Sequence, residues 1–125
     1  MTQPAHRIAL AACLAALLVS SPALAAQPVA HKVGAITWHA ARYVSETLTI
    51  VGYVLARDAG YVLFSDEPTG AISAHDLPVT GPGIEQLQQG KKYVLVGRFL
   101  AGGLKAGNGN TYHLELSAPP VASAR

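Results

Sequence analysis

In this chain of 125 residues, few side chains are suited to binding or catalysis by both their type and their place in the sequence. We select six candidates, which are aromatic or ionisable and lie beside predicted turns, in a predicted loop or on predicted strand faces. They are Tyr53, Tyr61, Asp66, His75, Lys105 and His113. Their rings offer stacking surfaces, and their charged or polar groups offer hydrogen bonds to a ligand. Because no serine lies in a nucleophile elbow, the pattern favours binding over catalysis. We therefore expect six ligand-binding residues, no catalytic residue, no bound metal and no cofactor.

Asp66 admits two interpretations. It closes a predicted strand, so its carboxylate is placed to meet a cation or a basic ligand. A turn follows directly, however, and aspartate at such a position commonly accepts hydrogen bonds from backbone N–H groups. The second interpretation is favoured.

The histidines suggest a metal or haem carrier as an alternative. His75, His113 and Glu115 are expected on neighbouring strands, where imidazole and carboxylate groups could hold zinc or copper. No H-x-H or H-E-x-x-H spacing supports this, so solvent-exposed histidines are favoured. His39 and Tyr43 form H-x-x-x-Y, which resembles a pair in a periplasmic haem chaperone, but there the pair follows the barrel. On a short helix this spacing simply places two side chains on one face.

A single-stranded nucleic acid is a further alternative, since Tyr53 and Tyr61 could stack bases beside basic side chains. The basic residues concerned are Lys91, Lys92, Arg98 and Lys105. Nine Lys and Arg residues oppose seven Asp and Glu residues, which gives a formal net charge of only +2. So small a charge disfavours nucleic acid as a partner.

Residues 1–25 have the organisation of a cleavable export signal. Arg7 precedes the uncharged apolar run 8–19, and Ala23-Leu24-Ala25 fits the small-x-small cleavage pattern. The run is shorter than the roughly 20 residues that cross a bilayer as a helix. Cleavage would also remove Cys13, the only cysteine. We expect a periplasmic protein that has no disulfide and no transmembrane segment after cleavage.

Alternating apolar residues after this signal predict five short strands. The predicted strands span residues 47–55, 61–66, 71–74, 92–100 and 111–116. Gly52 and Gly97 interrupt the first and fourth of them, which indicates bulges or bends of the kind that close a small barrel. In the last strand His113 is expected to face outward and Leu114 inward.

Short helices are predicted on either side of the first three strands. One spans 37–44, with Thr37 as its N-cap and Trp38 against the domain, and the other spans 84–89 after the Pro/Gly connection 77–83. The whole is divided into four parts by composition. These are a signal at 1–25, a flexible leader at 26–35, a domain at 36–117 and a disordered tail at 118–125.

This order of elements predicts an all-β fold, a small five-stranded OB-fold Greek-key barrel with a short N-terminal helix and a short helix between strands 3 and 4. A β-sandwich is the alternative, but five strands in about 75 residues close more readily than they stack. In such barrels the usual ligand surface is the face of strands two and three, flanked by the loops after strands one and four. Most of the six candidates are expected there.

Four short motifs carry a resemblance to a known family. They are Val51-Gly52-Tyr53-Val54, Tyr61 through Phe64 with Asp66, Thr69-Gly70-Ala71-Ile72 and Val94-Leu95-Val96-Gly97. Together they resemble the small periplasmic bacterial OB-fold proteins, called BOF proteins, over residues 36–116. The loop 101–110 is longer than in that pattern. The resemblance implies a non-enzymatic, exported binding module, linked to envelope or cationic stress.

We therefore expect a periplasmic binding protein whose partner is a small ligand, a peptide or an envelope component. A metal or haem carrier, a nucleic-acid-binding domain and a purely structural interaction protein are the alternatives. The residues indicate no particular oligomeric state.

Overall fold

The computed structural model describes residues 29–123, so the predicted signal at 1–25 lies outside the described residues. The elements in chain order are β1 (Ala30–Lys32), α2 (Val33–Thr37), the 3-10 turn η1 (Ala40–Tyr43), β2 (Thr47–Asp58), β3 (Tyr61–Ser65), β4 (Leu77–Thr80), the 3-10 turn η2 (Ile84–Gln86), β5 (Lys92–Ala101), β6 (Tyr112–Leu116) and β7 (Val121–Ala122). Among them no helix is long and apolar enough to span a membrane.

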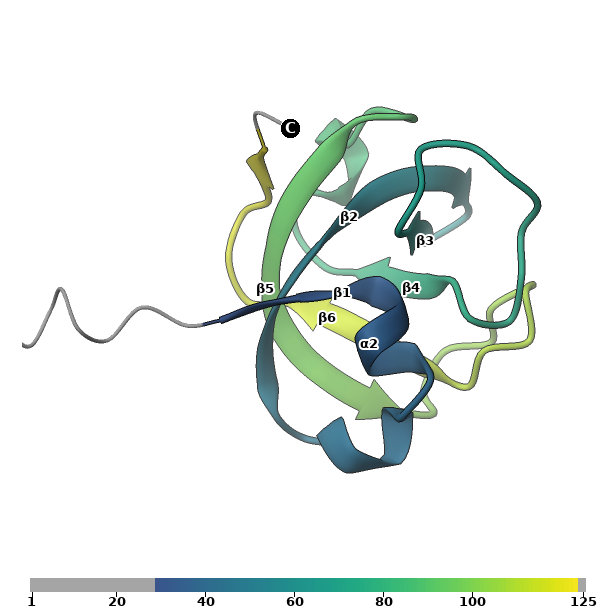
Figure 1. Ribbon diagram of the computed structural model, residues 1–125, viewed down its shortest axis with the longest axis vertical. Coiled ribbons are helices and arrows are strands. Elements are labelled where there is room, and N and C mark those ends of the chain that lie inside the picture. The colour runs from purple at the N-terminus through teal and green to yellow at the C-terminus, as the bar shows by residue number, and fades with distance from the viewer. Residues whose placement is uncertain (1–28, 124–125) are drawn as a thin grey trace, which may run out of the picture.

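Five of the strands close into a barrel (Figure 1). The order around it is β2, β3, β4, β6 and β5, and β5 returns to pair with β2. Every pair is antiparallel except β4 with β6. A closed mixed barrel with this Greek-key order and short helical turns has the OB-like architecture that the sequence predicts.

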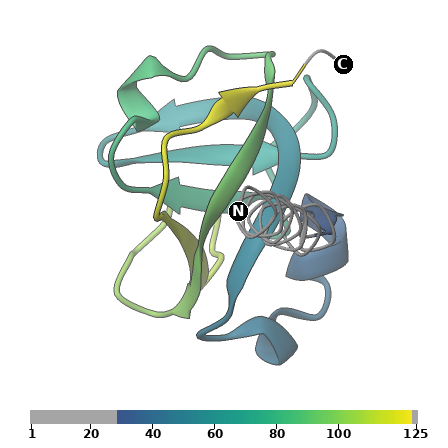
Figure 2. The same cartoon turned by 90° about the vertical axis from the view of Figure 1, so that its left-hand side faces the viewer.

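The two terminal strands lengthen the sheet beside the barrel. β1 runs parallel to β2, with Lys32 opposite Val51. β7 runs antiparallel to β5, with Ala122 opposite Tyr93, and Figure 2 shows this strand beside β5. The predicted flexible leader is therefore wrong from Ala30 onward, and the predicted disordered tail contains a strand. Both strands are too short to show alternation, and pairing to β2 and β5 is what makes them strands.

The core fills the barrel from alternating positions. Leu48, Ile50 and Val54 of β2 point inward, as their spacing predicts. Phe64 and Phe99 are fully buried among them. Fully burying a large apolar side chain stabilises a fold by roughly 1.5–3 kcal/mol. Helix α2 adds two more buried side chains, Val33 and Ile36, which join the same core.

The third strand and the first helix differ from their predictions. The strand expected at 71–74 lies at Leu77–Thr80, within the segment whose Pro and Gly residues indicated a connection. The first helix begins at Val33 rather than after Thr37, which is its last residue. The second helix is a single 3-10 turn, Ile84–Gln86. For the third strand and the first helix, contacts from distant residues, described below, decide the boundary.

The two strand glycines serve close packing rather than bulges. A Cβ at Gly52 would lie 2.8 Å from Val33 Cγ2 and 3.0 Å from the Ser65 carbonyl oxygen. A Cβ at Gly97 would collide with the carbonyl group of Glu115. The irregular register of β2 falls later, between Val54 and Ala56. Gly52 therefore lets α2 pack against the barrel, which is what brings the helix to the candidate site.

Candidate functional site

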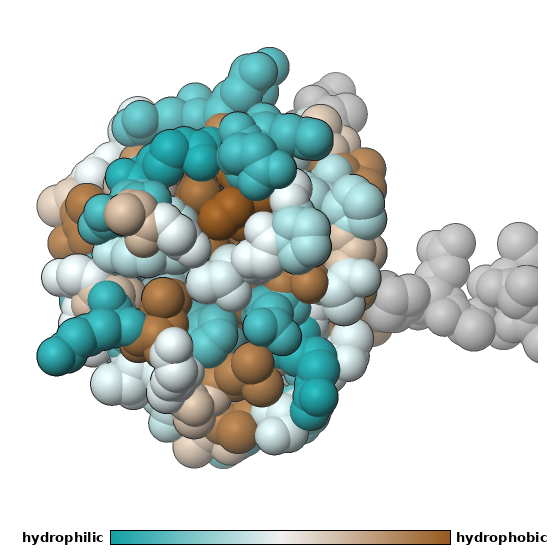
Figure 3. Space-filling view, turned by 180° about the vertical axis from the view of Figure 1, so that it is seen from behind, coloured by the Kyte–Doolittle hydropathy of each residue, from teal (hydrophilic) through white to brown (hydrophobic). Residues whose placement is uncertain are grey.

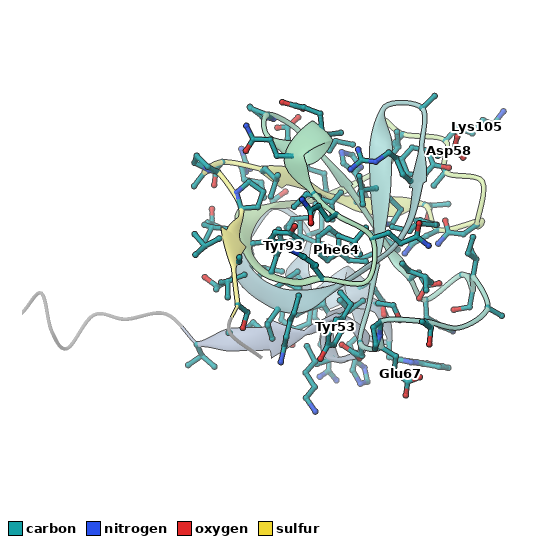
Figure 4. All side chains as sticks on the ribbon, turned by 90° about the horizontal axis from the view of Figure 1, so that it is seen from above. Tyr53, Asp58, Phe64, Glu67, Tyr93 and Lys105 are labelled. Atoms are coloured by element: carbon teal, nitrogen blue, oxygen red, sulfur yellow. The ribbon has the colours of Figure 1, made fainter. Side chains whose placement is uncertain are left out.

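Five of the six predicted residues divide between two regions, and the sixth, Lys105, lies on the loop between β5 and β6. Figure 4 shows Lys105 near Asp58 at one corner of the molecule and Tyr53 on the side where Glu67 also lies. We call the outer side of β3, β4 and β6, which carries Tyr61 and His113, the covered face. We call the surface around α2, which carries Tyr53, Asp66 and His75, the helix-side site.

The covered face is buried although it lies outside the barrel. In β3 the inward residues are Val62 and Phe64, so Tyr61 and Leu63 face outward, yet only 5% and 4% of these two is exposed. His113, next to the inward Leu114, is 7% exposed. The loop between β5 and β6 causes this burial. Its Gly107 N–H donates to the Tyr61 hydroxyl at 2.8 Å.

A relay of hydrogen bonds fastens this loop to the turn between β2 and β3. The Tyr61 hydroxyl accepts from Gly107 and donates to Asp58 Oδ2 at 2.9 Å. Asp58 Oδ1 accepts from the Ala59 N–H at 2.7 Å. The Ala59 N–H, and after it the Tyr61 hydroxyl, hold the pKa of Asp58 below its ordinary value because both favour the carboxylate.

Two asparagines fasten the same loop to the segment before β4. Asn108 Nδ2 donates to the carbonyl oxygens of Ser73 and Asp76, at 2.9 and 3.0 Å. Asn110 Nδ2 donates to the Asp76 oxygen at 3.0 Å. The Asp76 carboxylate closes its own turn by accepting from the Ser73 N–H at 2.7 Å. This turn occupies the place where the sequence predicted a strand.

The predicted ligand surface is thus filled by the chain itself. His113 faces outward as predicted, but the expectation that solvent surrounds it is wrong because the loop covers it. Its Nδ1 has no hydrogen-bond partner within residues 29–123. Lys105 is exposed on that loop, and Figure 4 shows it near Asp58.

The histidines do not gather as the metal alternative requires. His75 stacks on a tryptophan near α2, whereas His113 lies under the loop. In residues 29–123 no three His, Cys, Asp or Glu side chains form a group that could hold a metal ion. The pair His39 and Tyr43 is not joined either, and the Tyr43 ring instead meets the His31 ring at 5.8 Å.

The helix-side site contains a surface pocket of about 170 Å³. Its lining residues are Lys32, Val51, Gly52, Tyr53, Asp66 and Lys92. The strand registers explain their assembly, since Lys32 lies opposite Val51 and Lys92 lies opposite Tyr53. Because Ile50 and Val54 point into the core, Val51 and Tyr53 face outward between the two lysines.

The pocket lining carries two positive charges and one negative charge, a net charge of +1. Lys92 Nζ lies 5.6 Å from the centroid of the Tyr53 ring, within reach of a cation–π interaction. Asp66 is the one carboxylate of the lining, and its two oxygens accept from the N–H groups of Val33 and Gly34 at 2.7 and 2.9 Å. Within residues 29–123 neither Lys32 nor Lys92 forms an ion pair. Such a pocket suits an anionic group.

These bonds also decide between the two interpretations of Asp66. It bonds backbone N–H groups, as favoured, but they belong to α2 rather than to its own turn. Lys32, at the N-cap position, supplies no side-chain cap. A carboxylate from the end of β3 therefore caps the helix and sets its start at Val33.

The most exposed aromatic side chain, Trp38, was not among the predicted site residues. Trp38 was expected against the domain, but it is 66% exposed. Its ring stacks on His75, with ring centroids 3.6 Å apart and planes 15° from parallel. Lys32 was missed as well because it lay in the predicted leader. Lys92 was considered only for nucleic-acid binding. Its position at the start of an alternating strand was the signal that could have identified it as a site residue.

The back of the molecule has a mixed surface. Figure 3 shows hydrophobic residues among hydrophilic ones on the side turned away from α2. The helix-side site combines a pocket, two ammonium groups and two exposed rings.

Comparisons with known proteins add little to this geometry. No family model matches the chain, and no curated protein matches its sequence. Among solved structures, a DUF3299 family protein from Pseudomonas aeruginosa PAO1 is similar, with a TM-score of 0.49 and 8% sequence identity. The match covers 67% of this chain and 65% of that one, so it leaves about a third of the DUF3299 protein unmatched. The strand order alone defines the barrel, and no function follows from this likeness.

Proposed function

We propose that this protein is a periplasmic, non-enzymatic OB-fold binding module of the BOF type, and that it binds a small anionic ligand in the helix-side pocket. The observation that carries the proposal is the pair of unpaired ammonium groups, Lys32 and Lys92, which line the pocket from the two strands on either side of β2. Export follows from the predicted signal at 1–25.

The BOF motifs support the location. Three residues of the first motif, Val51, Gly52 and Tyr53, line the pocket, and so does Asp66 of the second motif. Two of the four motifs that resemble the family therefore meet at one place. The same arrangement favours binding over turnover, because the oxygens of Asp66 are already engaged by two N–H groups.

The covered face is the less suitable site. A ligand there would displace the loop, which breaks the Gly107–Tyr61 bond and the three bonds donated by Asn108 and Asn110. At roughly 1 kcal/mol net for each bond, opening costs several kcal/mol before any ligand contact forms. The helix-side pocket is open without any such cost.

A titration of isotope-labelled protein, residues 26–125, with sodium phosphate at constant ionic strength tests the proposal. We expect saturable amide shifts at Val51, Gly52 and Tyr53 in NMR spectra. The Lys32→Ala and Lys92→Ala variants should each weaken binding about tenfold, equivalent to about 1.4 kcal/mol. Lys91→Ala, beside the pocket lysine but outside the lining, is the matched control. Unchanged binding in the Lys32→Ala/Lys92→Ala double variant contradicts the proposal.

Native mass spectrometry of the protein purified gently from a periplasmic extract provides an independent test of the ligand. A retained anionic adduct of defined mass supports the proposal. A stoichiometric metal or haem adduct would instead favour the carrier alternative.

A further inference from the structure

Trp38 is exposed in a way that a folded chain ordinarily avoids. It is the only tryptophan of the chain, and 66% of it remains accessible. Leaving so large a ring in water forgoes the stabilisation that burial would give. The His75 ring covers one face of the indole at 3.6 Å. The exposed area therefore belongs mainly to the opposite face and its edges.

The stack is held in place from both sides. The backbone N–H of Trp38 donates to the Gly34 carbonyl oxygen at 3.1 Å, and the Asp66 cap fixes the start of α2. His75 N–H donates to Ser73 Oγ at 3.2 Å, in the turn that Asn108 fastens to the loop. These bonds hold the backbone on both sides of the stack, and the contact with His75 orients the indole. The ring therefore loses little further freedom when a ligand stacks on it.

Trp38 and the lysine pocket belong to one continuous surface. Asp66 lines the pocket, and its Oδ2 lies 2.9 Å from the Gly34 nitrogen. A Cβ built on Gly34 would lie 2.9 Å from that oxygen and 3.7 Å from Trp38 Cδ1. Gly34 therefore lies between Asp66 and the indole, and a side chain at this position would contact both.

We infer that the ligand of this surface is an aromatic acid, whose flat ring stacks on the open face of Trp38 while its carboxylate or phosphate group reaches Lys32 and Lys92. The near-parallel contact with His75 shows that the indole is oriented for face-to-face stacking. A ring on the other face repeats that contact. The inference rests on the proposed function, since it adds a second group to the same anionic ligand.

The single tryptophan makes the test direct. We expect 4-nitrobenzoate, which carries both groups, to quench Trp38 fluorescence saturably at pH 7. The neutral 4-nitrobenzyl alcohol should bind at least tenfold more weakly. The Lys32→Ala/Lys92→Ala variant should bind 4-nitrobenzoate no more tightly than it binds the alcohol. The Lys91→Ala variant should bind 4-nitrobenzoate as tightly as the unmodified protein does. Linear quenching of equal slope by both compounds overturns the inference.

A second measurement separates the ring from the charge. In NMR titrations Trp38→Ala should weaken the binding of 4-nitrobenzoate at least fivefold and leave the binding of acetate unchanged. Trp38→Phe should restore part of the lost affinity for 4-nitrobenzoate. If acetate and 4-nitrobenzoate bind the pocket equally in every variant, the inference fails while the proposed function stands. If neither compound nor phosphate shifts Val51, Gly52 or Tyr53, both fail.

Discussion

The covered face and the helix-side site differ in how far their aromatic side chains are exposed to solvent. On the covered face Tyr61 is 5% exposed and its hydroxyl has two partners, whereas at the helix-side site Trp38 is 66% exposed. The difference lies in what the chain places above each surface. A loop with its own donors fills the first, and nothing in residues 29–123 covers the open face of the second.

The composition of the loop explains its fit. Gly102, Gly103 and Gly109 adopt positive φ angles of 74°, 78° and 85°, which other residues rarely adopt. These conformations turn the loop back onto the barrel, where Asn108 and Asn110 bond carbonyl groups before β4. In this protein the loop fills the surface that OB barrels commonly use for ligands, and we propose that binding takes place beside α2 instead.

The largest expected effect separates the two tyrosines. Tyr61→Ala should lower the free energy of unfolding by about 3–5 kcal/mol, because it empties a buried site and removes two hydrogen bonds. Tyr53→Ala, at the partly exposed pocket, should cost less than about 1 kcal/mol. Urea unfolding measures both. Equal losses would contradict the contrast between the two regions, and Tyr61→Phe isolates the hydroxyl at about 1 kcal/mol.

The cap supplied by Asp66 should give the next largest effect. Asp66→Ala removes the acceptor for Val33 and Gly34, and should destabilise the protein by about 1–2 kcal/mol. Asp66→Asn retains one acceptor oxygen and should lose about half as much. Hydrogen exchange should accelerate at those two amides in Asp66→Ala. Unchanged exchange there would show that the start of α2 does not depend on this carboxylate.

Trp38 should matter little to stability. Trp38→Ala loses only the stacking on His75, worth less than about 1 kcal/mol, because most of the indole is already in water. Thermal unfolding checks this directly. A loss of 3 kcal/mol or more would identify Trp38 as a structural residue and remove the contrast with Tyr61.

The smallest effect concerns pH. The pKa of Asp58 is lower in the folded chain than in the unfolded one, so its contribution is fully present above the ordinary aspartate range. It is lost as pH falls below about 4 and through the lowered folded value. Unfolding curves between pH 6 and pH 2 should show this loss, and the Asp58→Asn variant should show less of it. An identical pH profile in both proteins would exclude the role of Asp58 in fastening the loop.

Local alternation predicted the fold well wherever strands bury one face. The inward residues Leu48, Ile50 and Val54 identified β2, and Leu114 and Leu116 identified β6. β4 was not predicted as a strand because Pro78 and the glycines after it are typical of a connecting loop. In the structure Pro78 nevertheless pairs with Leu63. β1 and β7 depend on partners far along the chain, which no local pattern reveals.

The candidate site shows the same division. Tyr53 and Asp66 were found because each stands at a recognisable strand position. Trp38 was assigned to the inside because an apolar residue at helical spacing usually lies there. Its exposure follows from the earlier start of α2, which the distant Asp66 determines. Lys32 became a site residue only through the pairing of β1 with β2.

One measurement tests the central claim most directly, namely that ligands bind beside α2 and not on the covered face. Isotope-labelled protein is titrated with 4-nitrobenzoate, and the shifts of all backbone amides are mapped. The account predicts saturable shifts at Gly52, Tyr53 and Trp38, with none at Tyr61 or His113. Shifts confined to the loop 101–111 and to His113 would contradict it, since they would show that the loop opens and that the covered face binds.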